Sequence, residues 1–398
     1  MKVVIIGAGI SGLLSAYYLL QKGHKVLVLE SASHVASKAS GANAAQLSYT
    51  YVNPIGSPSL PKMLPSIIMG RKKGFQIKKL NFKLMKWGLK LLRESTASRF
   101  QKNRTRLLEL SLQSRELFAE LKLNTGIEFK NYSTGKLQIL DSEALEKSAN
   151  EFSKILAIKG INLELLSRDE CAKKLDGFTL DDSFVSSVFS AIDETADCAA
   201  FCKSLLEYLR KDPNFTIFFD SAVKEWKSEG GRITSLITKQ GNKVKADSYL
   251  LCTGAQTNRL VKPLGLKFSI YPIRGYTLVY PYKSSLTCSV TDHKNKVVFV
   301  PHDDYLLVSG MFHFAGQNTS IDTDTVKHIH QCAVTRLPDL KNTDYTIRCG
   351  LRPCTPSSRP IIQQTKFKNL YINSGQGMYG WTLSTACAKR TADLISNH

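Results

Sequence analysis

Apolar and polar residues follow a strand–helix–strand pattern over the first thirty positions. Residues 3–6 and 26–29 are two uninterrupted apolar runs, each as long as a short buried strand. Between them, apolar residues recur at helical spacing from Leu13 to Leu20, and this pattern stops at Gly23. The pattern predicts a βαβ unit, in which a helix joins two parallel strands, and therefore an α/β protein.

The rest of the chain mixes the same two periodicities. Helical spacing predicts helices over residues 104–123, 142–159, 168–174, 198–210, 324–335 and 381–395. Apolar runs and alternation predict strands over residues 127–132, 135–140, 161–165, 184–190, 215–218, 223–226, 232–238, 243–251, 268–282, 297–300, 305–309, 345–350 and 370–374. Residues 54–65, which are interrupted by prolines, and residues 351–359 are expected to be loops.

Residues 69–93 combine apolar and basic side chains. The apolar ones are Phe82, Leu84, Met85, Trp87, Leu89, Leu91 and Leu92, and the basic ones include Lys78, Lys79, Lys83, Lys86, Lys90 and Arg93. This pattern is typical of a basic amphipathic helix that lies on an anionic membrane surface. It also fits a core helix with a solvated basic face, which is the commoner arrangement, so the sequence leaves both interpretations open.

The net charge is the unusual property of the composition. A chain of 398 residues with 43% hydrophobic and 22% charged residues is long enough for two domains and has the composition of a globular protein. Its formal net charge of +21 favours nucleic acid, acidic membrane surfaces or anionic ligands as partners. The basic residues are dispersed, and no stretch resembles an RNP, helix-turn-helix or zinc-finger element, so we expect no nucleic-acid binding.

The cysteines and the N-terminus both point to the cytoplasm. Nine cysteines are scattered without a CxxC pair, which is typical of reduced thiols, and we expect no metal site. The apolar run that follows Lys2 is too short for a signal peptide. No apolar run reaches the roughly 18 residues that are needed to span a bilayer.

The turn between the first strand and the first helix has the spacing of a dinucleotide-binding motif. It reads GAGISG over residues 7–12. Gly7 permits the tight turn, Gly9 lets the backbone approach a pyrophosphate, and Gly12 lets the helix pack closely on the strand. Glu30 ends the second strand, where an acid accepts hydrogen bonds from a ribose 2′-OH and would repel the 2′-phosphate of NADP.

Three further stretches have features that suit a nucleotide. Residues 40–46 are small and polar, although an ordinary surface loop would explain them equally well. Residues 252–255, CTGA, end a buried strand, and residues 375–380, GQGMYG, open the last helix. The N-terminus of that helix offers free N–H groups and the positive end of a dipole.

These motifs occur together in an order that resembles a known family. They are GAGISG with Glu30, Asn43-Ala44-Ala45-Gln46, GKLQ at 135–138, DETADC at 193–198, YPIRGY at 271–276, GLRP at 350–353 with Thr355-Pro356, and GQGMYGWT at 375–382. Over nearly the whole chain, the set resembles the FAD-dependent D-amino-acid oxidase superfamily. It is most similar to the bacterial D-amino-acid dehydrogenase (small subunit) branch.

The resemblance implies non-covalently bound FAD and two discontinuous domains. A glutathione-reductase-type FAD-binding Rossmann domain would comprise residues 1–60, 186–262 and 345–398, and a substrate domain with a mixed α+β sheet would comprise residues 61–185 and 263–344. The residues implied to hold FAD are Gly7, Gly9, Gly12, Glu30, Ser40, Asn43, Ala44, Gln46, Val223, Thr253, Gly254, Gly377, Tyr379, Gly380, Trp381 and Thr382. Cys349 is one position away from the cysteine through which sarcosine oxidases attach FAD, so we expect no covalent bond.

The resemblance also implies a substrate site. Arg352 would grip the substrate α-carboxylate, because a guanidinium can bind it bidentately, and Tyr276 and His313 would belong to the catalytic site. Outside the GLRP context, an arginine between leucine and proline would more often form a structural salt bridge. His313 replaces an acid that is usual in the dehydrogenase branch, and it either lines the substrate pocket or packs behind the sheet.

The implied reaction is oxidative deamination of a D-amino acid to the 2-oxo acid and ammonia, by hydride transfer from Cα to flavin N5. Electrons would pass to a quinone or another acceptor, with peripheral contact at the cytoplasmic face of the inner membrane. Two alternatives within the same superfamily stay open. One is an O2-using oxidase of glycine, sarcosine or another amine, and the other is an FAD-dependent 2-hydroxy-acid dehydrogenase.

Overall fold

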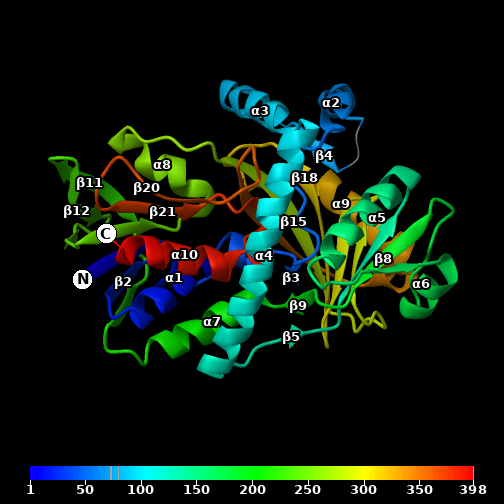
Figure 1. Cartoon of the computed structure of the whole chain (residues 1–398), viewed down its shortest axis with the longest axis horizontal. Coiled ribbons are helices and arrows are strands. Elements are labelled where there is room, and N and C mark those ends of the chain that lie inside the picture. The colour runs from blue at the N-terminus through cyan, green and yellow to red at the C-terminus, as the bar shows by residue number, and fades with distance from the viewer. Residues whose placement is uncertain (72–73, 79, 398) are drawn as a thin grey trace.

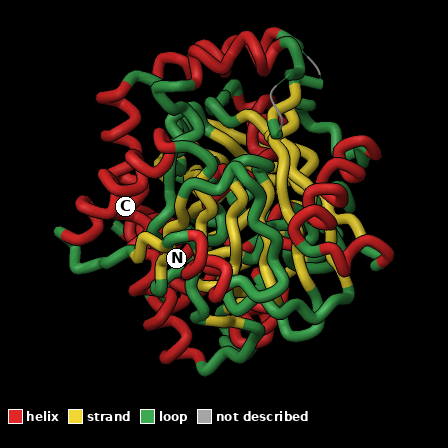
Figure 2. The backbone as a smooth tube through the Cα atoms, turned by 90° about the vertical axis from the view of Figure 1, so that its right-hand side faces the viewer, coloured by secondary structure: helices red, strands yellow, loops and turns green. Residues whose placement is uncertain are grey.

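Two large β-sheets form the centre of the molecule, and helices cover their outer faces (Figures 1 and 2). The computed structural model describes residues 1–71, 74–78 and 80–397. In the view of Figure 1 the six-stranded sheet lies on the left with both chain termini, and the nine-stranded sheet lies on the right. No helix in these three ranges is both long and apolar enough to cross a membrane.

The six-stranded sheet contains the predicted βαβ unit. Its strands, in spatial order, are β10 (Phe215–Phe218), β2 (Lys25–Leu29), β1 (Lys2–Ile6), β14 (Ser248–Leu251), β21 (Leu370–Ser374) and β20 (Ile361–Gln364). The first five are parallel, and β20 pairs antiparallel with β21. Parallel sheets are buried on both faces, which explains why the strands read as continuous apolar runs.

Successive residues of β1 supply two different cores. Val3 and Ile5 pack toward α1 (Ile10–Gln21), α7 (Cys198–Leu209) and α10 (Ser384–Ser396). Val4 and Ile6 pack on the opposite face, against an antiparallel sheet of β11 (Val223–Glu229), β12 (Arg232–Thr238) and β13 (Lys243–Val244). Both layers hold the glycine turn after β1 in a fixed position.

The nine-stranded sheet is mixed, and it lies beside the glycine turn. Its strands run in the order β19 (Thr346–Cys354), β15 (Tyr271–Tyr280), β18 (Leu306–His313), β17 (Val297–Pro301), β16 (Ser289–Asp292), β6 (Lys136–Leu140), β8 (Ser186–Ser190) and β7 (Glu164–Leu166), with β4 (Phe75–Gln76) paired to β18. A small third sheet consists of β3 (Gln46–Leu47), β9 (Glu194–Ala196) and β5 (Asn131–Tyr132). Helix α9 (Thr323–Arg336) packs on the apolar face of the large sheet.

The remaining helices surround these sheets. They are α2 (Leu60–Ile68), α3 (Phe82–Glu94), α4 (Ala97–Thr125), α5 (Glu143–Ala157), α6 (Arg168–Lys174) and α8 (Thr257–Val261). The long helix α4 packs on α10, where Ser114 Oγ lies 2.5 Å from Thr385 Oγ1. Gly126, with φ +62°, ends α4 in the left-handed conformation that glycine tolerates best.

Several predicted elements are corrected by the structure. The loop expected over residues 54–65 contains the start of α2, because Pro61 sits in the first helical turn, where a missing N–H costs nothing. The helix expected within residues 69–93 is α3 alone, and its N-cap Asn81 accepts the Leu84 N–H. Lys79 lies outside the described residues.

The most consequential correction concerns the loop expected over residues 351–359. Strand β19 continues to Cys354 and pairs with β15 along its whole length, so Ile273 lies opposite Arg352. Strand β20 was not predicted at all. The predicted domain boundaries place β8 and β19 with the FAD-binding segments, although both belong to the nine-stranded sheet. The division into domains stays a prediction.

Candidate active site

A cavity of about 1800 Å³ runs between the glycine turn and the nine-stranded sheet. Its walls come from the turn after β1, from residues 36–59, from the face of β15, β18 and β19, and from the turn before α10. A single small metabolite needs roughly 300–1,000 Å³. The cavity is therefore large enough for a dinucleotide cofactor together with a substrate.

The glycine turn has the geometry that the sequence predicts. Gly7 has φ +105°, and a Cβ atom there would lie 2.7 Å from the Cys252 carbonyl oxygen. A Cβ atom on Gly12 would lie 1.9 Å from the Gly7 carbonyl oxygen, which is a collision. The N–H of Ile10, in the first turn of α1, donates to Ser40 Oγ at 3.1 Å. This end of the cavity thus presents backbone donors and a helix N-terminus, as a pyrophosphate requires.

Glu30 lies at the same end of the cavity and is 5% exposed. Its carboxylate accepts hydrogen bonds from the Ala8 N–H at 2.7 Å and the Ala32 N–H at 2.9 Å, and from the Ser31 hydroxyl at 3.0 Å. A carboxylate has about four acceptor positions, so at least one is left for a ribose hydroxyl. Val223, Thr253 and Gly254 also line the cavity, as the resemblance implies.

The loop over residues 40–46 forms the next part of the wall. Asn43 fixes this loop by donating to the Ser40 carbonyl at 3.1 Å and accepting from the Ala45 N–H at 2.9 Å. Gln46 lines the cavity, and its Nε2 is buried without a hydrogen-bond partner in the described part of the chain. A buried donor that lacks a partner is costly, so a ligand acceptor at this point fits the flavin end of FAD.

The turn before α10 closes the cavity from the other side. Gly377 has φ +59°, and Thr382 Oγ1 accepts the Ser48 N–H at 3.1 Å. The polar atoms of Tyr379 and Trp381 donate to the carbonyls of Asn53 at 2.8 Å and Ala196 at 2.9 Å. The aromatic faces and backbone N–H groups of this turn are thereby held in place against the cavity.

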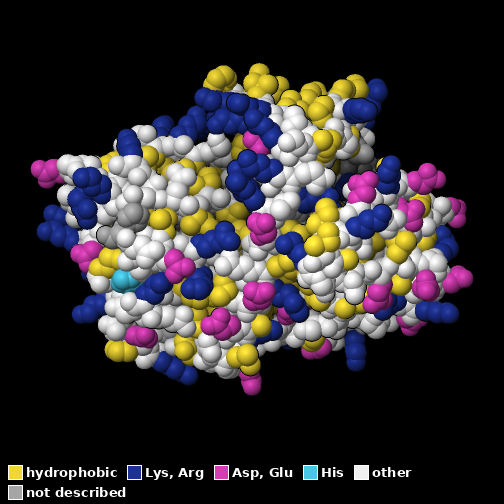
Figure 3. All heavy atoms as spheres, in the orientation of Figure 1, with side chains coloured by type: hydrophobic (Ala, Val, Ile, Leu, Met, Phe, Trp, Pro, Cys, Tyr) yellow, Lys and Arg dark blue, Asp and Glu magenta, His cyan; other side chains and the backbone are white. Residues whose placement is uncertain are grey.

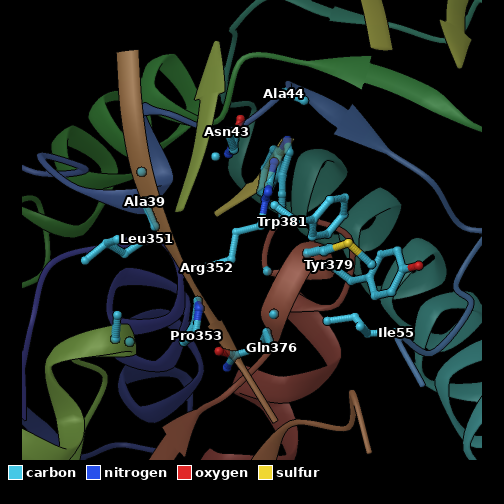
Figure 4. A pocket seen from close by; sticks show the side chains of 18 of the residues that line it. Ala39, Asn43, Ala44, Ile55, Leu351, Arg352, Pro353, Gln376, Tyr379 and Trp381 are labelled. Atoms are coloured by element: carbon cyan, nitrogen blue, oxygen red, sulfur yellow. The ribbon is translucent and has the colours of Figure 1, made fainter. Parts of the chain in front are cut away.

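Arg352 lies in the middle of the cavity wall. Figure 4 shows its side chain between the loop that carries Asn43 and Ala44 and the turn that carries Tyr379 and Trp381. One guanidinium nitrogen donates to the Met311 carbonyl at 2.6 Å. Burial lowers the pKa of Arg352, and no described carboxylate forms an ion pair with it. The structural salt bridge that the bare sequence favours is therefore not its role.

Two neighbours shape the position of the Arg352 guanidinium. The centroid of the Phe312 ring lies 5.0 Å from Cζ of Arg352, and the Phe75 ring stacks on that of Phe312 with 4.9 Å between the ring centroids. On the other side, a Cβ atom on Gly275 would lie 2.4 Å from one of the guanidinium nitrogens. Gly275 thus provides the space in which the guanidinium lies flat on β15, under an apolar wall.

The structure does not bring Tyr276 and His313 into the cavity, so their expected place in the catalytic site is corrected. Gly275 and Thr277 line the cavity, whereas the intervening Tyr276 side chain faces α9, as strand alternation requires. His313 is fully buried, with Nδ1 3.5 Å from Tyr276 Oη and Nε2 3.2 Å from Thr325 Oγ1. Burial lowers the pKa of His313 to about 4, so the imidazole is neutral at pH 7. His313 packs behind the sheet.

Lys136 is a cavity residue that sequence reasoning missed. It is 3% exposed, donates to Ser48 Oγ at 2.8 Å and lies 5.0 Å from the centre of the Tyr51 ring. Burial lowers its pKa to about 8. The signal was available, because Lys136 is the only charged residue of an otherwise apolar or uncharged strand. No three His, Cys, Asp or Glu side chains among the described residues gather as a metal site would require.

Replacing Lys136 with methionine should favour the folded protein more at pH 7 than at pH 10. The pKa of Lys136 falls from 10.5 to about 8 on folding, so the buried ammonium costs on the order of 3 kcal/mol below pH 8. As the pH rises from 8 toward 10.5, the folded lysine is already neutral and this cost disappears. The variant also removes the attraction between Lys136 and the buried carboxylate of Asp193, so the measured quantity is the change with pH. In urea denaturation, the stability of K136M relative to the wild type should be higher at pH 7 than at pH 10. An equal gain at both pH values would contradict the charge explanation.

Comparisons with known proteins agree with this geometry. The family model described as FAD dependent oxidoreductase matches residues 2–394. The chain is 32% identical to a D-amino acid dehydrogenase of Allorhizobium ampelinum and 31% identical to one of Vibrio cholerae, covering all of this chain and 95% of each relative.

Solved structures show the same fold at lower identity. Glycine oxidase from Geobacillus kaustophilus superposes with a TM-score of 0.78 at 19% identity, over all of this chain and 95% of that one. L-α-glycerophosphate oxidase from Mycoplasma pneumoniae, solved with FAD bound, superposes with a TM-score of 0.75 at 17% identity, over 99% of this chain and 94% of that one.

Proposed function

The chain belongs to the family of FAD-dependent oxidoreductases, and we propose that it is a dehydrogenase of D-amino acids. In the proposed reaction a D-amino acid is oxidised to the imino acid, which water hydrolyses to the 2-oxo acid and ammonia. FAD is the cofactor, and oxidation of an amino acid is the reaction class that the relatives support. Preference for the D enantiomer rests on the similarity to D-amino acid dehydrogenases and is the part that experiment must test.

The observation that carries this proposal is the Arg352 guanidinium on the cavity wall. A guanidinium has five N–H donors, and Arg352 uses one of them in its hydrogen bond to the Met311 carbonyl. No described carboxylate pairs with it. A half-buried cation with unused donors that lines a cavity is suited to an anionic ligand of planar shape, and the α-carboxylate of an amino acid is such a group. Fixing that carboxylate also fixes the orientation of the attached Cα–H bond.

The residues present fit FAD along the whole cavity. Gly7, Gly9, Gly12 and Glu30 would hold the ADP half, and Asn43, Gln46 and the turn over residues 377–382 would hold the flavin half. When bound, FAD supplies the two-electron oxidising power by accepting hydride from the substrate Cα. The backbone N–H groups at the N-terminus of α10 would stabilise negative charge close to them.

The walls around Arg352 have a second function, which is to exclude water. Phe75 and Phe312 stack on each other beside the guanidinium, and both line the cavity. In an environment without water, the attraction between a guanidinium and a carboxylate is stronger than at the protein surface. An apolar substrate side chain would also pack well on these two rings.

Anaerobic reduction tests the proposal directly. The holoenzyme is mixed with a panel of D- and L-amino acids without oxygen, and the visible absorption band of the flavin is followed. We expect several D-amino acids to bleach the band and their L enantiomers to leave it unchanged. Bleaching by L-amino acids alone, or by 2-hydroxy acids alone, would overturn the proposal.

We propose a membrane quinone as the electron acceptor and the cytoplasmic face of the inner membrane as the location of the enzyme. Nine cysteines without a disulfide support the reducing compartment. Turnover with a soluble quinone analogue should greatly exceed peroxide formation in air. Stoichiometric peroxide at an equal rate would instead favour the alternative of an O2-using amine oxidase.

A further inference from the structure

We propose that the outer face of α2 and α3 is a docking surface for an anionic phospholipid bilayer. The docking surface is defined by six large apolar side chains that are 53–75% exposed: Ile68, Met69, Leu80, Phe82, Met85 and Leu89. This surface would bring the enzyme to an electron acceptor in the membrane. Only the identity of that acceptor depends on the proposed function.

Helix α3 carries two apolar stripes on nearly opposite faces. Leu84, Trp87 and Leu91 form the inner stripe and are 5–6% exposed. The outer stripe has the same i, i+3, i+7 spacing and consists of Phe82, Met85 and Leu89. An ordinary surface helix has polar residues on its outer face. The outer stripe therefore indicates a partner that accepts apolar side chains.

The inner stripe fixes the direction in which the outer stripe points. Trp87 Nε1 donates to the Cys354 carbonyl at 3.1 Å. The centroid of the Trp87 ring lies 5.6 Å from that of Tyr271 and 6.2 Å from that of Phe314. Cys354 is the last residue of β19, the strand that carries Arg352. Since α3 is attached to the core in this way, it cannot rotate to bury Phe82 and Leu89 without losing those contacts.

Basic side chains lie along the outer stripe. Between residues 60 and 93 the sequence has ten Lys and Arg residues and no Asp or Glu. Lys83, Lys86, Lys90 and Arg93 are exposed and project from one flank of the stripe along α3. Figure 3 shows hydrophobic side chains at the top of the molecule, over α2 and α3, with a band of Lys and Arg directly beneath them.

This combination of apolar and basic side chains selects the occupant. Nucleic acid would neutralise the lysines but leave Phe82, Met85 and Leu89 in water. A second copy of the chain, related by two-fold symmetry, would bring equal positive charges together. An anionic bilayer accepts apolar side chains at the headgroup boundary and attracts lysines, whose long stems let the ammonium groups stay in water.

The docking surface also lies next to the cavity. Met63 from α2 and Phe75 from β4 line the cavity that Arg352 lines, and both belong to the segment that carries the docking surface. In Figure 1, α2, α3 and β4 form the top of the molecule, directly above β18. Docking would bring this wall of the cavity to the bilayer, where a lipid-soluble electron acceptor is dissolved.

Vesicle sedimentation of the holoenzyme tests the docking surface. The vesicles contain equal parts of phosphatidylcholine and phosphatidylglycerol, with pure phosphatidylcholine as the reference, at physiological salt. We expect binding to the mixed vesicles and little binding to the neutral ones. The double variant F82S/L89S should lower the affinity for the mixed vesicles about tenfold or more, because two large apolar side chains are removed from the contact.

Matched variants distinguish binding through this surface from non-specific hydrophobic adsorption and from attraction by the overall positive charge of the protein. L123S/I158S removes two apolar side chains that are 86% and 87% exposed elsewhere, and it should bind like the wild type. K83E/K86E should weaken binding, whereas K203E/K211E, which changes the net charge equally at exposed positions on and beside α7, should not. Flavin absorption and turnover with a soluble acceptor should be unchanged in all four variants.

Three outcomes would overturn the docking surface. The first is the absence of wild-type binding to the mixed vesicles, and the second is equal binding by F82S/L89S and L123S/I158S. The third is a dimer in sedimentation analysis that F82S/L89S dissociates, which would assign the face to a second copy. Vesicle binding and sedimentation use no amino-acid substrate, unlike the turnover control, so failure of the docking surface is distinguishable from failure of the proposed reaction.

Discussion

Replacing Arg352 with methionine will lower kcat/KM for the best D-amino acid by about three orders of magnitude while FAD stays bound. Arg352 lies on strand β19 and lines the cavity. Its guanidinium is held against the ring of Phe312. Removing one partner of a desolvated charge pair costs about 2–5 kcal/mol, and 4 kcal/mol corresponds to about a thousandfold. Rapid-mixing measurement of flavin reduction, with the FAD content determined for each sample, checks the prediction.

Two further variants separate the charge of Arg352 from its shape. R352K keeps the positive charge but loses the planar guanidinium that can bind a carboxylate with two parallel hydrogen bonds, so it should retain an intermediate activity. G275A keeps the arginine but places a methyl group where the guanidinium lies, 2.4–2.6 Å from its atoms, and it should resemble R352K more than wild type. If R352M reduces flavin with an unchanged dependence on substrate concentration, the carboxylate-binding role of Arg352 is wrong.

Replacing Gly12 with valine will abolish retention of FAD. Even a Cβ atom at this position would lie 1.9 Å from the Gly7 carbonyl oxygen, so the glycine turn and the start of α1 must separate. Overpacking that shifts the backbone costs about 1–3 kcal/mol and occasionally more, and a cost of about 3 kcal/mol borne by the FAD-binding turn lowers FAD affinity about a hundredfold. The ratio of flavin to protein absorbance after purification, and FAD titration of the stripped protein, measure this loss.

Gly88 provides the matched control for Gly12. It lies within α3, has no atom within 4 Å of an added Cβ, and its φ is that of an ordinary residue. G88A should therefore bind FAD like the wild type and be slightly more stable, because alanine is a better helix former than glycine. Full FAD content in G12V would show that the turn tolerates a side chain and that the packing argument fails.

The nucleotide end could be predicted from sequence because its determinants are local. The glycines at 7, 9 and 12 and the acid at 30 act within one βαβ unit, whose order along the chain is also its order in space. The structure confirms the unit and adds the hydrogen bonds that Glu30 makes. In contrast, the resemblance identified Arg352, but its place on a strand was missed.

Counting alternate residues along a strand could not predict which face of the nine-stranded sheet each side chain occupies. Strands β15 and β18 shift register between Arg274 and Tyr276, and Met311 has φ +69° next to this irregularity. A bulge of this kind moves later side chains to the other face, so alternation does not decide where His313 points. Pro61 failed as a loop signal because it lies in the first turn of α2, where a missing N–H costs nothing, whereas Pro65 lies inside the helix, where proline is usually excluded.

Gly275 has a consequence for changing the substrate range of this enzyme. The proposed carboxylate anchor, Arg352, rests on the backbone of two paired strands, β15 and β19, and cannot be moved without rebuilding the sheet. The rings above it come partly from β4, which lies in the segment between α2 and α3. An engineer who wants another substrate should therefore leave residues 275, 312 and 352 unchanged and diversify positions 63 and 75, because these two line the cavity without touching the guanidinium.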